Sequence, residues 1–97
     1  MNKPVINVCQ CPNCLAADNH PDKALHHQMN LFLSRLNEQQ RRWYVALESK
    51  KIGRGGDRLM SLVTGMHVGT IRRGRRELDD YLETRPVDRI RLSKNSA

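Results

Sequence analysis

Three cysteines, Cys9, Cys11 and Cys14, stand within six residues near the start of the chain. An odd number of thiols this close together does not suit a disulfide framework, whereas thiolate and imidazole groups are the preferred ligands of zinc. The last two cysteines form a Cys-Pro-x-Cys core that is common in zinc knuckles, and His20 follows six residues later. The spacing predicts a Cys3His zinc site with His20 as the fourth ligand and His26 as the alternative. Reduced thiols on a mobile arm are the competing interpretation.

A second group of reactive side chains is basic. Residues 35–76 hold eleven Lys and Arg against three Asp and Glu, while the whole chain carries a formal net charge of +7. Such concentrated positive potential attracts polyanions, and nucleic acid is the most common one for a small protein. A solvated, solubilising surface would produce the same count, so the elements that position these charges decide between the two readings.

Two amphipathic helices are expected first. Asp22 offers a cap for a helix over 23–36, in which Leu25, Met29, Phe32, Leu33 and Leu36 recur on one face. A second helix is predicted over 38–51, because Asn37 followed by Gln40 matches a capping box. We expect its buried stripe to consist of Trp43, Tyr44 and Leu47, with Arg41 and Arg42 facing outward.

A helix-turn-helix is expected next, over about 57–82. Asp57 is the predicted cap of a short helix over 58–64 that buries Leu59, Leu62 and Val63, and Gly65 supplies the left-handed residue that ends it. A second helix then begins at His67 or Val68 and runs for about fifteen residues. Its inward face holds Ile71, Gly74, Leu78 and Leu82, where Gly74 permits close packing on a neighbouring helix.

The opposite face of this second helix suits a recognition helix. On a helical wheel Gly69, Arg73 and Arg76 point away from Ile71, Thr70 and Arg72 lie on the flanks, and Arg75 lies nearer the buried stripe. Arginine forms bidentate hydrogen bonds with guanine in the major groove. The candidate DNA-binding residues are His67, Gly69, Thr70, Arg72, Arg73, Arg75, Arg76, Arg54 and Arg58.

From residue 36 to about 91 the chain resembles the amino-terminal region of ISAzo-type insertion-sequence transposases. The matching stretches are residues 36–44 (LNEQQRRWY), 51–56 (KIGRGG), 64–66 (TGM), 70–78 (TIRRGRREL) and 89–91 (RIR). The resemblance implies a helix-turn-helix that recognises transposon-end DNA. His67 stands where the family has a Ser or Asp cap. In the family a metal-dependent catalytic domain with active carboxylates follows beyond the point matching residue 97, so the resemblance implies DNA binding without transposition.

We therefore expect an all-α protein: a Cys-rich, loop-rich arm over 1–21, a helical DNA-binding domain over 22–82 and a flexible tail over 83–97. The expected function is sequence-specific binding of double-stranded DNA. The alternative is a small transcriptional regulator or protein-interaction module that acts as a dimer, with the helix over 25–36 as the partner surface. Asp79, Asp80 and Glu83 are expected to form a solvated acidic helix end, so an enzyme is not expected. No apolar run suits a membrane span or a secretion signal, which favours the cytoplasm.

Overall fold

The computed structural model describes residues 6–80 and 82–84, and over these ranges every regular element is helical. The elements in chain order are α1 (Pro12–Leu15), α2 (Pro21–Leu33), α3 (Glu38–Ile52), α4 (Gly56–Thr64), α5 (Val68–Asp80) and the 3-10 turn η1 (Leu82–Thr84). The predicted all-α class is thereby confirmed. Within the described part of the chain, no helix has both the length and the apolar character that crossing a membrane requires.

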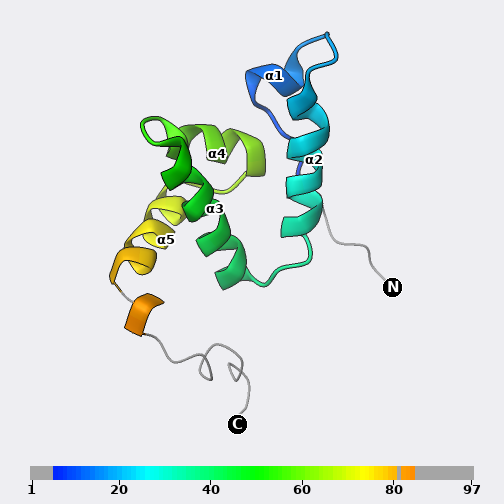
Figure 1. The fold of residues 1–97 in the computed structure, drawn as a ribbon. Helices are drawn as coiled ribbons and strands as arrows, with labels where there is room; N and C mark the ends of the chain where they lie inside the picture. Colours follow the sequence, from blue (N-terminus) through cyan, green and yellow to red (C-terminus); the bar gives the residue numbers. More distant parts are fainter. Residues whose placement is uncertain (1–5, 81, 85–97) are drawn as a thin grey trace.

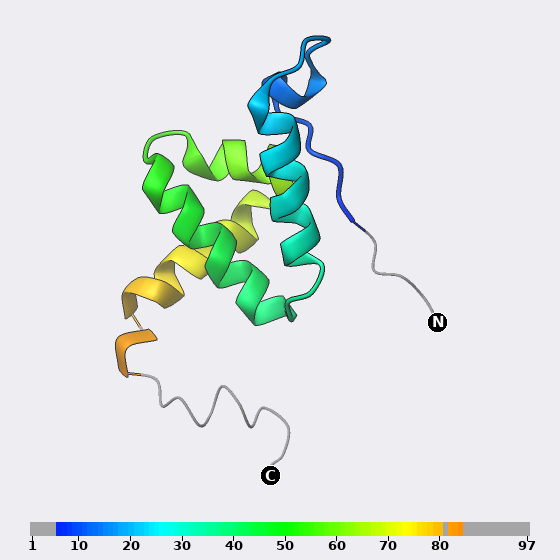
Figure 2. The same ribbon diagram turned by 45° about the vertical axis from the view of Figure 1, so that its right-hand side comes forward.

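Helix α3 is the centre of the packing, with α4 and α5 both lying against it (Figure 1). The main core cluster takes one residue from each of the four longer helices, namely Leu33, Val45, Met60 and Ile71. Helix α2 stands beside this group and meets α4, and α1 sits at the start of α2 (Figure 2). Helix α4 thus contacts both α3 and α2, while α5 packs on α3 and α4.

Local sequence signals set some helix boundaries as expected and others not. The capping box is present: Gln40 N donates to Asn37 Oδ1 at 2.8 Å, and the Gln40 side chain accepts from Asn37 N at 3.0 Å. Helix α2 begins at Pro21, two residues earlier than predicted, and its cap is His20 rather than Asp22. Helix α4 begins at Gly56, because Gly55 takes the cap position in a left-handed conformation, so Asp57 is not its cap.

The prediction for the inner face of α3 was partly wrong. Arg42, expected to face outward, is 3% exposed, and Leu47, expected inside, is half exposed. Trp43 and Tyr44 are only partly buried. The fully buried apolar residues of this helix are Val45 and Ala46. Arg42 lies inside because its guanidinium pairs with carboxylates there, as burial of a charge requires.

Burial on the flanking helices also departs from the sequence expectation. Leu25 and Phe32 of α2 and Leu62 of α4 are exposed, although each was assigned to a buried stripe. Val63 and Ile71 are buried as predicted. Helices this short are covered on a narrow side only, so the outer members of an apolar stripe stay in contact with water.

Two glycines confirm the steric roles expected of them. Gly65 ends α4 with φ +79, a left-handed conformation that side chains oppose. Gly74 is buried where α5 crosses α3, and a Cβ there would lie 2.7 Å from Arg42 O and 2.9 Å from Ala46 Cβ. Gly74 therefore allows α5 to approach α3 closely.

The predicted outer segments differ in how far the structure describes them. The arm expected over 1–21 contains the one-turn helix α1, and Pro21 already belongs to α2. Residues 83 and 84 of the expected flexible tail belong to η1, and the rest of that tail lies outside the described residues.

A candidate metal centre beside a candidate nucleic-acid interface

Four potential ligand atoms converge where the arm meets α2. The sulfurs of Cys9, Cys11 and Cys14 each lie 3.4 Å from Nδ1 of His26. All four atoms lie within 4.8 Å of one another, which makes this group able to hold a metal ion. Cys9 and Cys11 are buried, and the other two residues are partly buried.

The geometry of this cluster is that of a ligand set rather than of a hydrogen-bond network. One ring nitrogen can make only one hydrogen bond, so three equidistant sulfurs are not explained by hydrogen bonding alone. A tetrahedral zinc ion, with bonds of about 2.3 Å to sulfur and about 2.0 Å to nitrogen, would place each sulfur about 3.5 Å from the nitrogen. The observed 3.4 Å matches that spacing closely.

The one-turn helix α1 brings the cysteines together. Cys14 N donates to Cys11 O at 3.1 Å, which folds the chain back so that two thiols face the same side. Cys11 N lies 3.4 Å from Cys9 Sγ and donates to it. A hydrogen bond of 2.9 Å from Asn13 to Asp22 then ties α1 to the start of α2, the helix that carries the histidine.

His20, the expected fourth ligand, is not part of the cluster. Its Nδ1 accepts a hydrogen bond of 3.0 Å from Asp22 N and so caps α2. His26, in the second turn of α2, takes the ligand position that the sequence prediction gave to His20. The sequence prediction chose the histidine nearer in the chain, whereas the helix brings the more distant one back beside the thiols.

Burial and mutual hydrogen bonding separate the thiols in acidity. Burial raises the pKa of Cys9 to about 12, and it also raises the pKa of Cys14. Burial acts in the same sense on Cys11, but the backbone N–H of Cys14 and the neighbouring thiols outweigh it and lower the pKa of Cys11. Three such thiols cannot all ionise side by side without a cation among them.

Solvent reaches this cluster through a small hollow. The hollow has a volume of about 180 Å³ and is lined by Val8, Cys9, Cys14, Lys23 and His27. Two of the three thiols, those of Cys9 and Cys14, therefore border this hollow.

The predicted helix-turn-helix is formed by α4, the turn after Gly65 and α5. His67 precedes α5, and its Nδ1 accepts a hydrogen bond of 2.9 Å from Gly69 N. Its carbonyl accepts from Thr70 N and Ile71 N. The imidazole thus fills the cap position that a Ser or Asp side chain commonly fills at the start of a helix.

The outer face of α5 carries exposed guanidinium groups. Arg76 is exposed and makes no hydrogen bond or ion pair with the part of the chain that is described. Arg73 is exposed but donates to Glu77 at 3.0 Å, and both arginines border a hollow of about 440 Å³ together with Glu77 and Asp80. The two arginines therefore share a side of α5, opposite the buried Ile71.

Another hollow, lined by arginines, lies at the start of α4. It has a volume of about 360 Å³, and four arginines line it against one carboxylate: Arg54, Arg58, Arg72 and Arg75 around Asp57. Arg75 donates to Asp57 at 3.1 Å and to Ser49 at 3.1 Å, so it holds α5 to α3 and α4. The other three arginines are exposed.

The remaining candidate positions on α5 are small. Gly69 is exposed and Thr70 is partly buried, both in the first turn of the helix next to the cap. The sequence prediction missed Glu77, which accepts from Arg42, Trp43 and Arg73. The partners from α3 are more than thirty residues away, and no local pattern indicates such a link.

Comparison with protein families, with curated proteins and with solved structures found no match to this chain. The assignment of function therefore depends on the geometry of the two sites.

Proposed function

We propose that this protein binds double-stranded DNA through its helix-turn-helix, with α5 as the recognition helix, and performs no catalysis. The observation that carries the proposal is the two-sided character of α5. Ile71 and Gly74 are buried against the neighbouring helices, while Arg72, Arg73 and Arg76 are exposed on the rest of the surface. This is the arrangement that a helix needs to enter the major groove.

The arginine-lined hollow at the start of α4 supports the same orientation of the protein on DNA. Arg54 and Arg58 lie at the start of α4 beside Arg72 of α5, so positive charge continues from the recognition helix to the preceding helix. In helix-turn-helix proteins the first helix crosses the phosphate backbone. We assign Arg54 and Arg58 to phosphates, Arg73 and Arg76 to base edges, and Gly69 and Thr70 to close approach of the helix start. We assign Arg75 a structural role, because it donates to Ser49 of α3 and Asp57 of α4.

Salt dependence tests the electrostatic part of this proposal. Neutralising about five to eight phosphates would give a slope of log affinity against log salt of roughly −4 to −7. The measurement is fluorescence anisotropy on random-sequence duplex over a salt series, followed by binding-site selection. A slope near zero would contradict the proposal.

Mutation tests the residues. The Arg73→Ala/Arg76→Ala double variant is expected to lose about 1–3 kcal/mol of discrimination per base contact and to bind selected duplex at least tenfold more weakly. Arg35→Ala is the matched control, because Arg35 is exposed in the turn after α2 and lies on neither helix of the motif. Equal binding by the double variant and the parent would refute the assignment of α5.

For the metal centre, we propose zinc bound by Cys9, Cys11, Cys14 and His26 as a structural ion. The support is the donor set and the 3.4 Å spacing of three sulfurs around one nitrogen. All four positions are occupied by side chains, which is typical of structural and not of catalytic zinc sites. Metal analysis should find one zinc per chain, and His26→Ala should lower it strongly, whereas His20→Ala should not.

One observation favours the second candidate function, a dimeric regulator. Leu25 and Phe32 on α2 are half exposed. An apolar face of this kind can pair with a second copy of the chain. Light scattering with and without duplex decides the point, since a dimer in the absence of DNA would favour a regulator that reads two half-sites.

A further inference from the structure

The segment that carries the first two cysteines also crosses the end of α4. Gln10 N donates to Leu62 O at 2.9 Å, and Asn7 Nδ2 donates to Val63 O at 3.1 Å. Both carbonyls belong to the last turn of a helix, where no backbone donor of that helix remains to satisfy them. Residues 6–11, which we call the arm segment, thus complete the hydrogen bonding of α4 directly before the helix-turn-helix turn.

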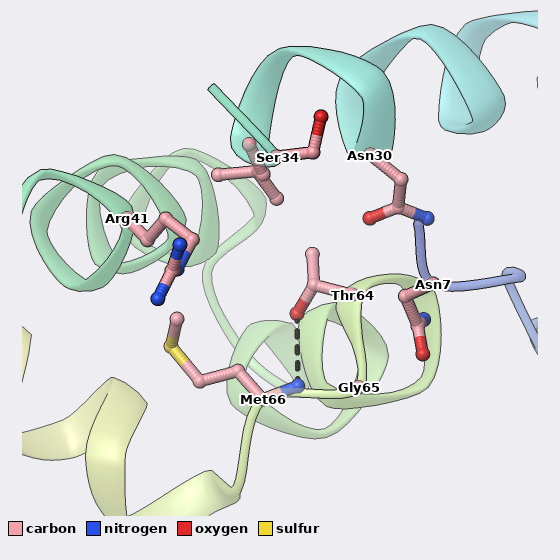
Figure 3. A pocket seen from close by; sticks show the side chains of 8 residues that line it. Asn7, Asn30, Ser34, Arg41, Thr64, Gly65 and Met66 are labelled. Carbon is pink, nitrogen blue, oxygen red and sulfur yellow. Dashed lines mark hydrogen bonds between the residues drawn. The ribbon is translucent and has the colours of Figure 1, made fainter. Parts of the chain in front are cut away.

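Helix α2 reaches the same point from the other side. Asn30 is 3% exposed, and its Nδ2 donates to Val63 O at 2.8 Å. Val63 O therefore accepts from two asparagines, one on the arm segment and one on α2. Figure 3 shows Asn30 above the turn at Gly65 and Asn7 beside it, so that the two asparagines approach the turn from separate elements.

Three of the four candidate metal ligands belong to these same two elements, and the fourth, Cys14, lies in α1 between them. Cys9 and Cys11 lie in the arm segment and pack with Val63 in one buried cluster. His26 stands one helical turn before Asn30, on the same face of α2. An ion held by these ligands would join the arm segment to α2 close to the place where both donate hydrogen bonds to the end of α4.

The contact between α2 and the turn is not densely filled. A hollow of about 340 Å³ opens between α2, α3 and the turn, bordered by Asn7, Asn30, Arg41, Gly65 and Met66 among others (Figure 3). Leu33 and Met29 of α2 pack in the apolar clusters that include Met66 and Val63, and the two asparagines add directional hydrogen bonds to the end of α4. The arm segment also leaves no space for a side chain at Gly65, since a Cβ there would lie 2.6 Å from Asn7 Oδ1.

We propose that metal occupancy of the Cys3His site sets the position of the helix-turn-helix turn, through Asn7 and Asn30 on Val63 O, and that DNA affinity is therefore linked to zinc. This inference rests on the proposed zinc site and the proposed DNA binding. Linkage is reciprocal, so bound duplex would raise the affinity for zinc by the same factor as zinc raises the affinity for duplex.

The first test needs no DNA. Amide hydrogen exchange is followed by NMR with one equivalent of zinc chloride and after chelation. We expect chelation to speed exchange of Gly65 N–H, which donates to Ser61 O, at least tenfold more than exchange of Val45 N–H inside α3. Equal acceleration at both amides would show that zinc stabilises the whole domain, and no acceleration at Gly65 would show no linkage. Either result overturns the proposal.

The second test separates the linkage from zinc binding. Asn7→Ala keeps all four ligands but removes one donor to Val63 O, and Asn19→Ala is the control because Asn19 is exposed in the loop between α1 and α2. In the parent and in Asn19→Ala, chelation should weaken duplex binding by about 5- to 150-fold, the usual range of coupling between sites. In Asn7→Ala the loss should be much smaller, and Gly65 should exchange at nearly the chelated rate even with zinc bound.

The possible failures are distinguishable. A chain that takes up no zinc overturns both the metal proposal and the linkage. Uptake of zinc with equal chelation effects in the parent and Asn7→Ala overturns the linkage alone. If no variant binds duplex, the DNA proposal fails, and hydrogen exchange at Gly65 still decides whether the metal positions the turn.

Discussion

Glu77 shows how a single side chain can join two helices. Its Oε1 accepts from Arg42 Nε at 2.7 Å and from Trp43 Nε1 at 2.9 Å, and its Oε2 accepts from Arg73 Nε at 3.0 Å. Arg42 has a second carboxylate partner in Glu38 at 2.6 Å. The buried guanidinium is therefore compensated from both α3 and α5.

The first prediction concerns the ion pair between Arg42 and Glu77. Glu77→Gln keeps an oxygen for Trp43 but removes the charge beside buried Arg42. We expect a loss of about 3 kcal/mol in the free energy of unfolding, the lower end for breaking a buried pair, because Glu38 remains. Urea unfolding measures it. Glu83→Gln, at an exposed position, should change stability by less than about 0.5 kcal/mol, and equal effects of the two substitutions would contradict the role of Glu77.

For single residues, the sequence predicts the type of chemistry better than it predicts which side chains will interact. The three thiols could be named as ligands because they lie within six residues of one another. The histidine that completes the set depends on where α2 begins, and His20 is used as the cap of that helix. Arg42 was expected outside for a similar reason, since its burial depends on a carboxylate thirty-five residues later.

At the scale of elements, boundaries fixed by neighbouring residues were predictable. The capping box of α3 involves only Asn37 and Gln40, and the end of α4 follows from a glycine with positive φ. The start of α4 was not predictable in this way. Gly55 replaces a side-chain cap there, and Asp57 accepts from Ser49 of α3 at 2.5 Å instead.

The second prediction concerns the crossing of α3 and α5. Alanine favours a helix over glycine by about 1 kcal/mol, yet Gly74→Ala should destabilise the protein by about 1–3 kcal/mol, because the new Cβ would meet the backbone oxygen of Arg42. Chemical unfolding with circular dichroism measures the change. Gly69→Ala in the same helix is the control, since its Cβ would meet only the imidazole of His67. Stabilisation by Gly74→Ala would show that the helices separate easily.

For the whole molecule, carboxylates hold together a chain that is rich in cations. Asp57 links α4 to Ser49 of α3 and to Arg75 of α5, Glu77 links α5 to α3, and Lys50 of α3 pairs with Asp79 of α5. The sequence indicated the positive charge of the helix-turn-helix but not this set of restraints. Each of them joins residues that only the packed helices bring together.

The last prediction follows from the acidity of these carboxyl groups. Partial burial acts to raise the pKa of Glu77, but the hydrogen bonds from Arg42 and Trp43 outweigh it, and the pKa is lowered from its usual value of 4.5. Asp57 behaves alike: burial acts upward, while Ser49 and Arg75 lower the pKa from 3.8. The unfolded chain then binds protons more readily than the folded chain in mild acid. The stability that both groups supply is complete above about pH 5 and is lost as the pH falls through 4 and below.

Urea unfolding at pH 6, 5, 4 and 3, in the presence of a chelator so that zinc does not contribute, should show this loss in the parent. In Glu77→Gln the loss should be smaller, because position 77 no longer takes up a proton, and the gap in stability between the two proteins should narrow with acid. The remaining acid sensitivity of the variant is assigned to Asp57, since Asp57→Asn in the same background should reduce it further. A gap that stays constant from pH 6 to pH 3 would mean that the Glu77 carboxylate does not hold α5 to α3 by its charge.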